Sequence, residues 1–336
     1  MRRSAILGVG HHVPSKVVTN DDLAKLFNTS DEWIVQRSGI RERRYIEGDG
    51  VFASDLAVPA CKMACEKAGV ALSEIDAIIF ATLSPDAFFP GTGCFLQAKL
   101  GLPGIPALDI RNQCSGFLYA LSTAVAHVRA GMARHVLVVG AETHSAALDL
   151  SPGGRTVASL FGDGAGAVIV SATEEDRGVR GVYLGADGRF AEVLCQKIWD
   201  IRERPFIKKN PDGSGHVPAD RLWATMDGKL VFKHAVGTML AALMRACSAH
   251  KLGVEDIDLF LFHQANMRIN QYVAQQLGVP DTKIPHNIQR YGNTTAATIP
   301  ILLDECVRGG RLKDGDLLVM TAFGAGFSWG SVACRW

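Results

Sequence analysis

The chain has 336 residues, of which 48% are hydrophobic and 21% are charged. This length and composition predict a globular protein with enough chain for two core-bearing halves. The 35 lysines and arginines balance the 34 aspartates and glutamates, so the formal net charge is +1. Charge balance therefore gives no reason to expect nucleic acid as a partner.

Membrane insertion and secretion are not predicted either. Arg2 and Arg3 precede an apolar run that glycines interrupt and that ends at His11, too short for a signal peptide. No stretch approaches the length of a transmembrane helix. The eight cysteines show no paired C-x-x-C spacing, which is typical of a reducing compartment and predicts no metal site. We therefore expect a cytoplasmic protein.

Short apolar runs alternate with helical patterns along the chain. The expected strands are residues 5–9, 77–81, 107–110, 135–139, 167–170, 259–262, 317–321 and 331–334. The expected helices are residues 21–27, 31–37, 55–68, 117–130, 230–251, 268–277 and 296–307. This alternation predicts an α/β fold with largely parallel sheets.

Residues 194–222 interrupt the alternation. They are polar, contain several prolines and glycines, and follow neither the helical nor the strand period. We expect a long surface insertion. Such loops serve as lids or stay disordered, and the sequence favours neither.

The two halves of the chain repeat one order of elements. Each has a helix, a strand, a turn that starts another helix, and a glycine-rich turn between strands. The matching segments are residues 69–80 with 253–262, 111–114 with 290–293, and 162–167 with 324–330. The repeat predicts a duplication into residues 1–173 and 174–336.

Cys114 lies where the expected strand 107–110 turns into a helix. Unpaired N–H groups at a helix N-terminus favour negative charge, and the thiolate is the reactive form of cysteine. In the repeat, Asn293 matches Cys114, and His263 follows the strand that matches 77–80. Because active sites of open α/β sheets lie beyond the carboxyl ends of strands, we expect the three to meet. Taken singly, an inert buried cysteine, a structural histidine and a helix-capping asparagine are the alternatives.

Two other functions fit these residues less well. Papain-like proteases also use Cys, His and Asn, but the chain has no Cys-Gly-Ser-Cys-Trp signature near its N-terminus. The glycines of residues 162–166 resemble a dinucleotide fingerprint, but they lack its third spacing and precede a strand-like run. The turn at residues 324–326 can instead present the Ala325 N–H beside that of Cys114, which predicts an oxyanion hole.

These motifs resemble the β-ketoacyl-acyl-carrier-protein synthase III family of the thiolase-like superfamily, and the resemblance runs from the first strand to Trp336. The segments that carry it are residues 29–34, 37–43, 114–117, 161–167, 263–266, 292–294 and 323–330. It implies a five-layered αβαβα fold, a homodimer and a triad of Cys114, His263 and Asn293. The implied reaction holds an acyl group from acyl-CoA on Cys114 and condenses it with malonyl-acyl-carrier protein, with loss of CO2.

The resemblance also implies individual roles. His263 and Asn293 would donate hydrogen bonds to the enolate, and the N–H groups of Cys114 and Ala325 would stabilise the tetrahedral oxyanion. The remaining roles are CoA binding by Trp33, Arg37, Arg155 and Asn266, closure of the acyl pocket by Phe89 from the dimer partner, and carrier-protein contact by Lys233 and Arg268. Without the family, core packing or solvated charge would explain these side chains. No permanently bound cofactor is implied.

Some features depart from the family pattern. Gln113 is typical of relatives that make specialised products such as quinolones or pyrones, Ala325 replaces an expected glycine, and Gln275-Gln276 stand where a basic pair would assist carrier binding. The insertion at 194–222 is longer than the usual loop. The acyl donor therefore stays open. The alternatives are a specialised ketosynthase, a non-decarboxylating acyltransferase and a non-catalytic partner subunit; a thiolase is disfavoured because residues 324–330 contain no second cysteine.

Overall fold

The structure is a computed structural model that describes residues 3–202 and 204–336. Its first sheet has the strand order β1-β7-β6-β4-β5. The strands are β1 (Arg3–His12), β4 (Ala77–Ala81), β5 (Ala107–Ile110), β6 (His135–Glu142) and β7 (Gly164–Thr173). β4 runs parallel to β5 and β6, whereas β7 is antiparallel to β1 and β6. The sheet is therefore mixed rather than largely parallel, because β7 starts at the end where β6 stops.

The second sheet repeats the first. Its order is β13-β14-β15-β8, formed by β8 (Gly178–Ala186), β13 (Leu259–Phe262), β14 (Leu317–Gly324) and β15 (Ser328–Arg335). β13 is parallel to β14, and β15 is antiparallel to β14 and β8. The order and direction of these four strands match those of β4, β6, β7 and β1 in the first sheet. The predicted duplication of the fold is confirmed, although β5 has no counterpart in the second sheet among the described residues.

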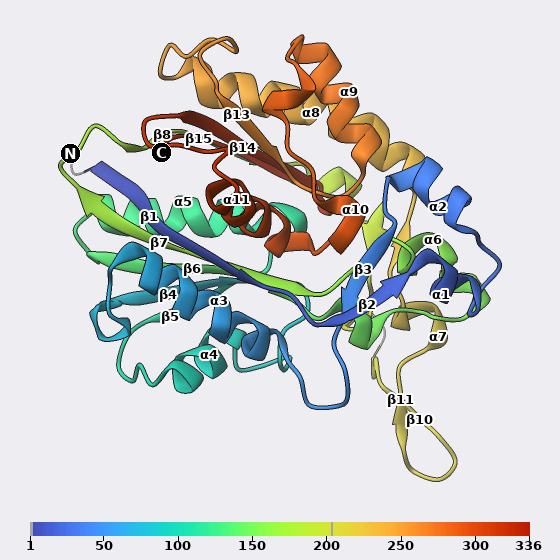
Figure 1. Cartoon of the computed structure of the whole chain (residues 1–336). Coiled ribbons are helices and arrows are strands. Elements are labelled where there is room, and N and C mark those ends of the chain that lie inside the picture. The colour runs from blue at the N-terminus through green and yellow to red at the C-terminus, as the bar shows by residue number, and fades with distance from the viewer. Residues whose placement is uncertain (1–2, 203) are drawn as a thin grey trace.

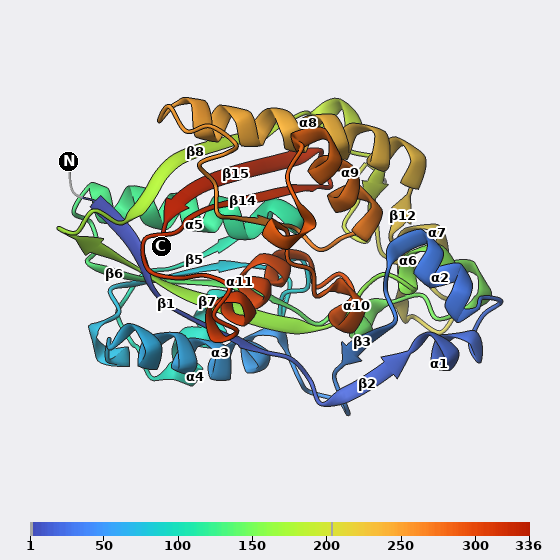
Figure 2. The same ribbon diagram turned by 45° about the horizontal axis from the view of Figure 1, so that its top comes forward.

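Helices form three layers around these sheets, as Figures 1 and 2 show. Helices α3 (Ala53–Ala68) and α4 (Thr92–Leu100) cover the outer face of the first sheet. Helices α5 (Gly116–Arg129) and α11 (Thr298–Arg308) pack between the two sheets. Helices α8 (Gly228–Ser248) and α9 (Met267–Leu277) cover the second sheet. The five-layered αβαβα arrangement is confirmed.

Helix α8 is the one helix among the described residues that is long and apolar enough to cross a membrane. Seven of its residues are buried. Met239 and Leu243 belong to the same apolar cluster as Phe260 and Phe262 of β13. We therefore assign α8 to the protein core.

A smaller lobe lies at one edge of the sheets, on the right of Figure 1. Its elements are β2 (Lys16–Thr19), α1 (Asn20–Ala24), α2 (Asp31–Ser38), β3 (Glu42–Tyr45), α6 (Arg155–Ala158) and α10 (Ile288–Tyr291). β2 and β3 form an antiparallel hairpin. Apolar residues of the lobe, among them Leu23, Ile34 and Ile288, share one cluster.

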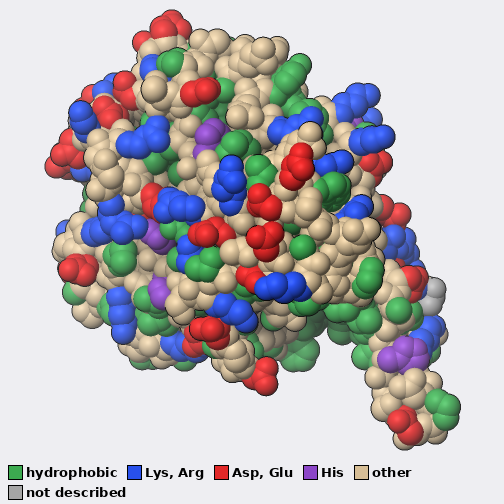
Figure 3. All heavy atoms as spheres, turned by 45° about the vertical axis from the view of Figure 1, so that its right-hand side comes forward, with side chains coloured by type: hydrophobic (Ala, Val, Ile, Leu, Met, Phe, Trp, Pro, Cys, Tyr) green, Lys and Arg blue, Asp and Glu red, His purple; other side chains and the backbone are tan. Residues whose placement is uncertain are grey.

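The insertion contains more regular structure than expected. It holds β9 (Leu194–Cys195), β10 (Lys208–Lys209), β11 (Gly215–His216) and α7 (Ala219–Leu222), and it is followed by β12 (Thr225–Met226). β9 pairs with β12, while β10 and β11 form a hairpin that stands clear of the body in Figures 1 and 3. Trp199 stacks on Phe88, with ring centroids 4.1 Å apart. The insertion therefore packs against the segment between β4 and α4.

Candidate active site

Cys114 lies in a single 3₁₀ turn, Gln113–Ser115, directly before α5. Its side chain is buried. The backbone N–H groups of Cys114 and Ala325 lie near the sulfur and favour its thiolate form. The two N–H groups expected to form an oxyanion hole thus lie together at the expected nucleophile. Ala325 is not among the described non-glycine residues with left-handed φ. An alanine therefore fits this turn.

Gly324 is the close neighbour that the Cys114 turn requires. A Cβ added to Gly324 would lie 2.6 Å from the Cβ of Cys114 and 3.1 Å from its Sγ. We expect Gly324→Ala to displace Cys114, lowering the free energy of unfolding by about 1–3 kcal/mol and reducing acyl loading in parallel. Chemical denaturation and intact-mass spectrometry measure the two effects.

Gly237→Ala is the matched control for this substitution. A Cβ at Gly237, which is exposed in α8, meets nothing within 4 Å. Alanine there should raise stability by up to about 1 kcal/mol and leave loading intact. Equal behaviour of the two variants would contradict the close approach at Gly324.

Burial, not the helix N-terminus, dominates the protonation of Cys114. Desolvation and the nearby charge of Glu142 raise the pKa of the thiol to about 12, against the lowering effect of the Ala325 and Cys114 N–H groups. The expected stabilising N–H groups are present, but burial outweighs them. The free protein therefore holds a thiol rather than a thiolate at neutral pH.

This protonation state has a measurable consequence. We expect the rate of Cys114 alkylation by iodoacetamide to rise about tenfold per pH unit from about pH 6 to about pH 9, because only the thiolate reacts. Peptide mapping by mass spectrometry follows Cys114 specifically. A plateau below about pH 8 would show instead that the thiol ionises near neutrality.

His263 follows β13 and is 3% exposed. Its backbone N–H donates to the Thr321 carbonyl (2.9 Å), and its ring Nδ1 lies 2.6 Å from the Thr298 hydroxyl. No described residue is a partner of Nε2. Burial lowers the pKa of the imidazole to about 3, so His263 is neutral at physiological pH. It is therefore suited to hydrogen bonding rather than to carrying a charge.

Asn293 is buried just before the turn that leads into α11. Its side-chain Oδ1 accepts a hydrogen bond from the Thr295 backbone N–H (2.8 Å). Its backbone N–H donates to the Leu160 carbonyl (2.8 Å). Because the amide oxygen is engaged, the NH2 end is the one available to a substrate.

The structural repeat pairs Cys114 with Ala296, so the predicted equivalence with Asn293 is wrong. Gln113 (φ 45°) and Thr295 (φ 47°) share the left-handed conformation. Each starts a 3₁₀ turn that runs directly into a helix, α5 or α11. Asn293 precedes Ala296 by three residues. The sequence match of 111–114 with 290–293 is therefore displaced by three residues from the structural repeat.

Glu142, at the end of β6, is a buried carboxyl group that the sequence analysis missed. It accepts hydrogen bonds from the Leu83 N–H (3.0 Å) and from the Ser84 hydroxyl (2.7 Å), with the Ala296 N–H at 3.5 Å. Burial raises its pKa to about 7. Glu142 therefore links the end of β4 to the turn before α11, beside Cys114. An acidic residue directly after the apolar run of residues 136–141 was the available signal.

A cavity of about 1330 Å³ opens beside Cys114. Its walls include His144, Phe161, Thr295 and Ala325, together with Trp199 of the insertion. His144 is also a residue that the sequence analysis missed: its Nε2 lies 2.6 Å from the Thr295 hydroxyl. His263 and Asn293 do not line this cavity, and they join the site through the 295–298 turn.

The four expected CoA-binding residues lie together. The guanidinium groups of Arg37 and Arg155 lie over the Trp33 ring, 4.4 Å and 4.6 Å from its centroid. The Asn266 side chain caps α9 and donates to the Arg37 carbonyl (2.9 Å). Thr156, next to Arg155, lines the cavity that contains Cys114. The cluster is therefore adjacent to that cavity.

The other three expected site residues are exposed. Lys233 lies on α8 and Arg268 on α9, where the Arg268 guanidinium is 5.9 Å from the Phe232 ring centroid. Phe89 is 79% exposed and does not line the cavity of its own chain. Its predicted role requires a second subunit.

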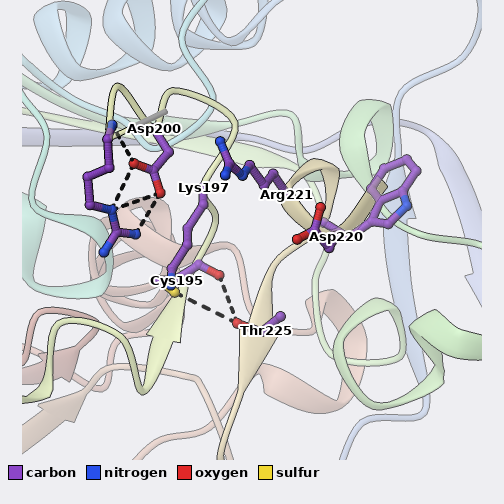
Figure 4. Close-up of a pocket in the computed structure, with 8 residues that line it drawn as sticks. Cys195, Lys197, Asp200, Asp220, Arg221 and Thr225 are labelled. Atoms are coloured by element: carbon purple, nitrogen blue, oxygen red, sulfur yellow. Dashed lines mark hydrogen bonds and ion pairs between the residues drawn. The ribbon is translucent and has the colours of Figure 1, made fainter. Parts of the chain in front are cut away.

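A second cavity, of about 220 Å³, is lined by residues of the insertion and of the segment that follows it (Figure 4). Charged side chains and Cys195 line it, and Asp200 is paired with Arg202 (2.6 Å). The Thr225 hydroxyl lies 3.7 Å from the Cys195 sulfur. Cys114, His263 and Asn293 do not line this cavity, but Cys195, Trp223 and Thr225 line it and the larger cavity alike, so the two cavities adjoin.

Comparisons with known proteins identify the family of the chain. Residues 108–188 match the family described as 3-oxoacyl-[acyl-carrier-protein] synthase III, and residues 247–336 match its C-terminal family. A beta-ketoacyl-[acyl-carrier-protein] synthase III from Xanthomonas oryzae is 44% identical, over 99% of this chain and 98% of its own. The crystal structure of the Aquifex aeolicus 3-oxoacyl-[acyl-carrier-protein] synthase III has a TM-score of 0.89 at 39% identity, covering 99% of this chain and 100% of its own. The priming β-ketosynthase of the R1128 polyketide pathway has a TM-score of 0.89 at 34% identity, covering 99% and 96%.

Proposed function

Because the chain belongs to the 3-oxoacyl-[acyl-carrier-protein] synthase III family, with its thiolase-like fold, we propose that it condenses an acyl group from acyl-CoA with malonyl-acyl-carrier protein and releases CO2. It is an acyltransferase. One observation carries the assignment of residues: the turn of Cys114, with the Cys114 and Ala325 N–H groups near its sulfur, packs against the turn that holds both His263 and Asn293.

The first half-reaction loads Cys114. Its sulfur attacks the thioester carbonyl of acyl-CoA, and the resulting oxyanion accepts hydrogen bonds from the Cys114 and Ala325 N–H groups. When the intermediate collapses, the bond to the CoA sulfur breaks and CoA leaves with the proton that Cys114 has lost. The product is an acyl-Cys114 thioester.

The second half-reaction extends the acyl group. The malonyl C–CO2 bond breaks and its electron pair forms an enolate, whose oxygen accepts hydrogen bonds from His263 and Asn293. The enolate carbon attacks the acyl-Cys114 carbonyl, and the second oxyanion again lies on the two N–H groups. Collapse releases the 3-oxoacyl thioester, and a proton from solution restores the Cys114 thiol.

The experiment is to incubate the protein with a panel of acyl-CoAs and malonyl-acyl-carrier protein, measuring both CO2 and the 3-oxoacyl product. Stoichiometric formation of the two supports the proposal. Transfer of the acyl group to an alcohol or amine without CO2 would favour the acyltransferase alternative instead. The panel also identifies the preferred donor.

We further propose how the substrates are bound. Trp33 would stack on the adenine of CoA, with Arg37 and Arg155 contacting the nucleotide end and Asn266 contacting pantetheine. The stacking of both guanidinium groups on Trp33 supports a site for a flat, anionic group. Lys233 and Arg268 would meet the acidic carrier protein, because both are exposed on neighbouring helices.

We also propose a cytoplasmic homodimer in which Phe89 of one subunit closes the acyl pocket of the other. Phe88, Phe89 and Trp199 are each more than half exposed in the single chain, and large exposed apolar groups mark interfaces. The division into residues 1–173 and 174–336 is supported by the segment between β7 and β8, which joins the two repeated sheets.

A specialised pathway is the second candidate. The similarity to a priming β-ketosynthase of a polyketide pathway favours it, as does the presence of Trp199 and Ile198 of the insertion in the cavity wall. Preference for a long or branched acyl-CoA over acetyl-CoA in the same panel would support this candidate.

A further inference from the structure

The turn formed by residues 295–298 connects His263 and Asn293 through hydrogen bonds. Thr295 is fully buried in the left-handed conformation, and its own hydroxyl is 2.6 Å from His144 Nε2. Its N–H holds the Asn293 oxygen. Thr298, also buried, contacts the His263 ring. One turn therefore orients both side chains.

The Thr298 hydroxyl has a single proton and two possible acceptors. His263 Nδ1 is 2.6 Å away and the Thr295 carbonyl oxygen is 3.1 Å away. The shorter distance falls within the range of O–H donors and below the usual range of N–H donors to oxygen, whereas 3.1 Å exceeds the usual O–H···O range. The Thr295 carbonyl, moreover, already accepts the Thr298 N–H. The geometry favours donation to Nδ1.

We propose that Thr298 is a positioning residue that sets the tautomer of His263. Its hydroxyl donates to Nδ1, so the one proton of the neutral imidazole is on Nε2. Nε2 is buried and has no partner among the described residues. His263 therefore presents an N–H donor to the site, just as Thr295 makes Asn293 present its NH2 group.

The inference rests on the proposed function, because an Nε2–H donor is needed only if an enolate oxygen forms beside His263. With the proton on Nδ1, the lone pair of Nε2 would face the developing negative charge and oppose decarboxylation. Thr295 and Thr298 thus make Asn293 and His263 hydrogen-bond donors without placing a cation in the buried site.

Nitrogen-15 NMR of the free, histidine-labelled protein tests the tautomer, with His263→Ala used to assign the signal. We expect the Nε2–H form in the natural protein and in Thr298→Ser, which retains the hydroxyl. Thr298→Val, which keeps the shape but lacks the hydroxyl, should show a mixture of tautomers. An Nδ1–H form in the natural protein would overturn the proposal.

Decarboxylation of malonyl-acyl-carrier protein supplies the second readout. We expect Thr298→Val to lose about tenfold to hundredfold in decarboxylation, with a smaller loss in acyl loading, and Thr298→Ser to restore most of the rate. Equal decarboxylation by the Val and Ser variants would overturn the proposal. Thermal unfolding checks that both variants are folded.

The two measurements separate this inference from the proposed function. The NMR signal is read without substrate, so the Nε2–H tautomer in a protein that releases no CO2 would contradict the function and not the tautomer. The Nδ1–H tautomer in an active enzyme would contradict the tautomer and not the function.

Discussion

Replacing Cys114 by alanine abolishes the covalent acyl adduct that acyl-CoA forms with the natural protein, and condensation falls by about 10⁴-fold or more. The reason is that the variant lacks the sulfur that lies near the Cys114 and Ala325 N–H groups and carries the acyl group. The thiol also fills a buried position, so the alanine side chain costs little packing and the protein stays folded. Intact-mass spectrometry after incubation with acyl-CoA measures the adduct directly.

Cys195→Ala is the matched control. Cys195 is a second thiol in the wall of the same cavity as Cys114, and its sulfur hydrogen bonds to the Glu192 carbonyl and the Thr225 hydroxyl. The control should keep the full adduct. Stoichiometric labelling of the Cys114→Ala protein would show that the acyl group is held elsewhere, and loss of labelling in the control would point to Cys195.

Regular periods in the sequence predicted most of the helices and strands, whereas the five-layered arrangement was implied by the family resemblance. Residues 77–81, 107–110 and 259–262 form the expected strands. The first and third are short apolar runs, and the second is apolar except for Asp109. β8 was missed because three glycines and several half-buried side chains break its alternation. The mixed direction of both sheets was also missed, since strand direction depends on connections and not on apolar pattern.

The sequence brought Cys114, His263 and Asn293 forward as candidates, but it did not predict the hydrogen bonds that connect them. Cys114, His263 and Asn293 stand at turns or strand ends, which local sequence can reveal. Thr295 and Thr298 gave no such signal, because their importance comes from hydrogen bonds between segments that fold together. The displaced match of Cys114 with Asn293 has the same origin: the backbone conformation at Gln113 and Thr295, not residue type, marks the repeat.

Asn293→Asp tests the division of labour between the two half-reactions. Aspartate retains an oxygen that accepts the Thr295 N–H, so the turn should keep its shape. The substitution removes the NH2 donor and places a carboxylate where the enolate oxygen develops. We therefore expect decarboxylation to fall by about 10²- to 10³-fold, while acyl loading of Cys114 falls much less.

His263→Ala should show the same split, because its neutral imidazole contributes a donor and not a charge. Asn293→Ala separates the two causes, since it removes the donor without adding negative charge and should decarboxylate faster than Asn293→Asp. Rates of CO2 release and of acyl-Cys114 formation, measured separately, decide the outcome. If all three variants lose both half-reactions equally, His263 and Asn293 support the thiol itself, and the enolate must be stabilised by the Cys114 and Ala325 N–H groups instead.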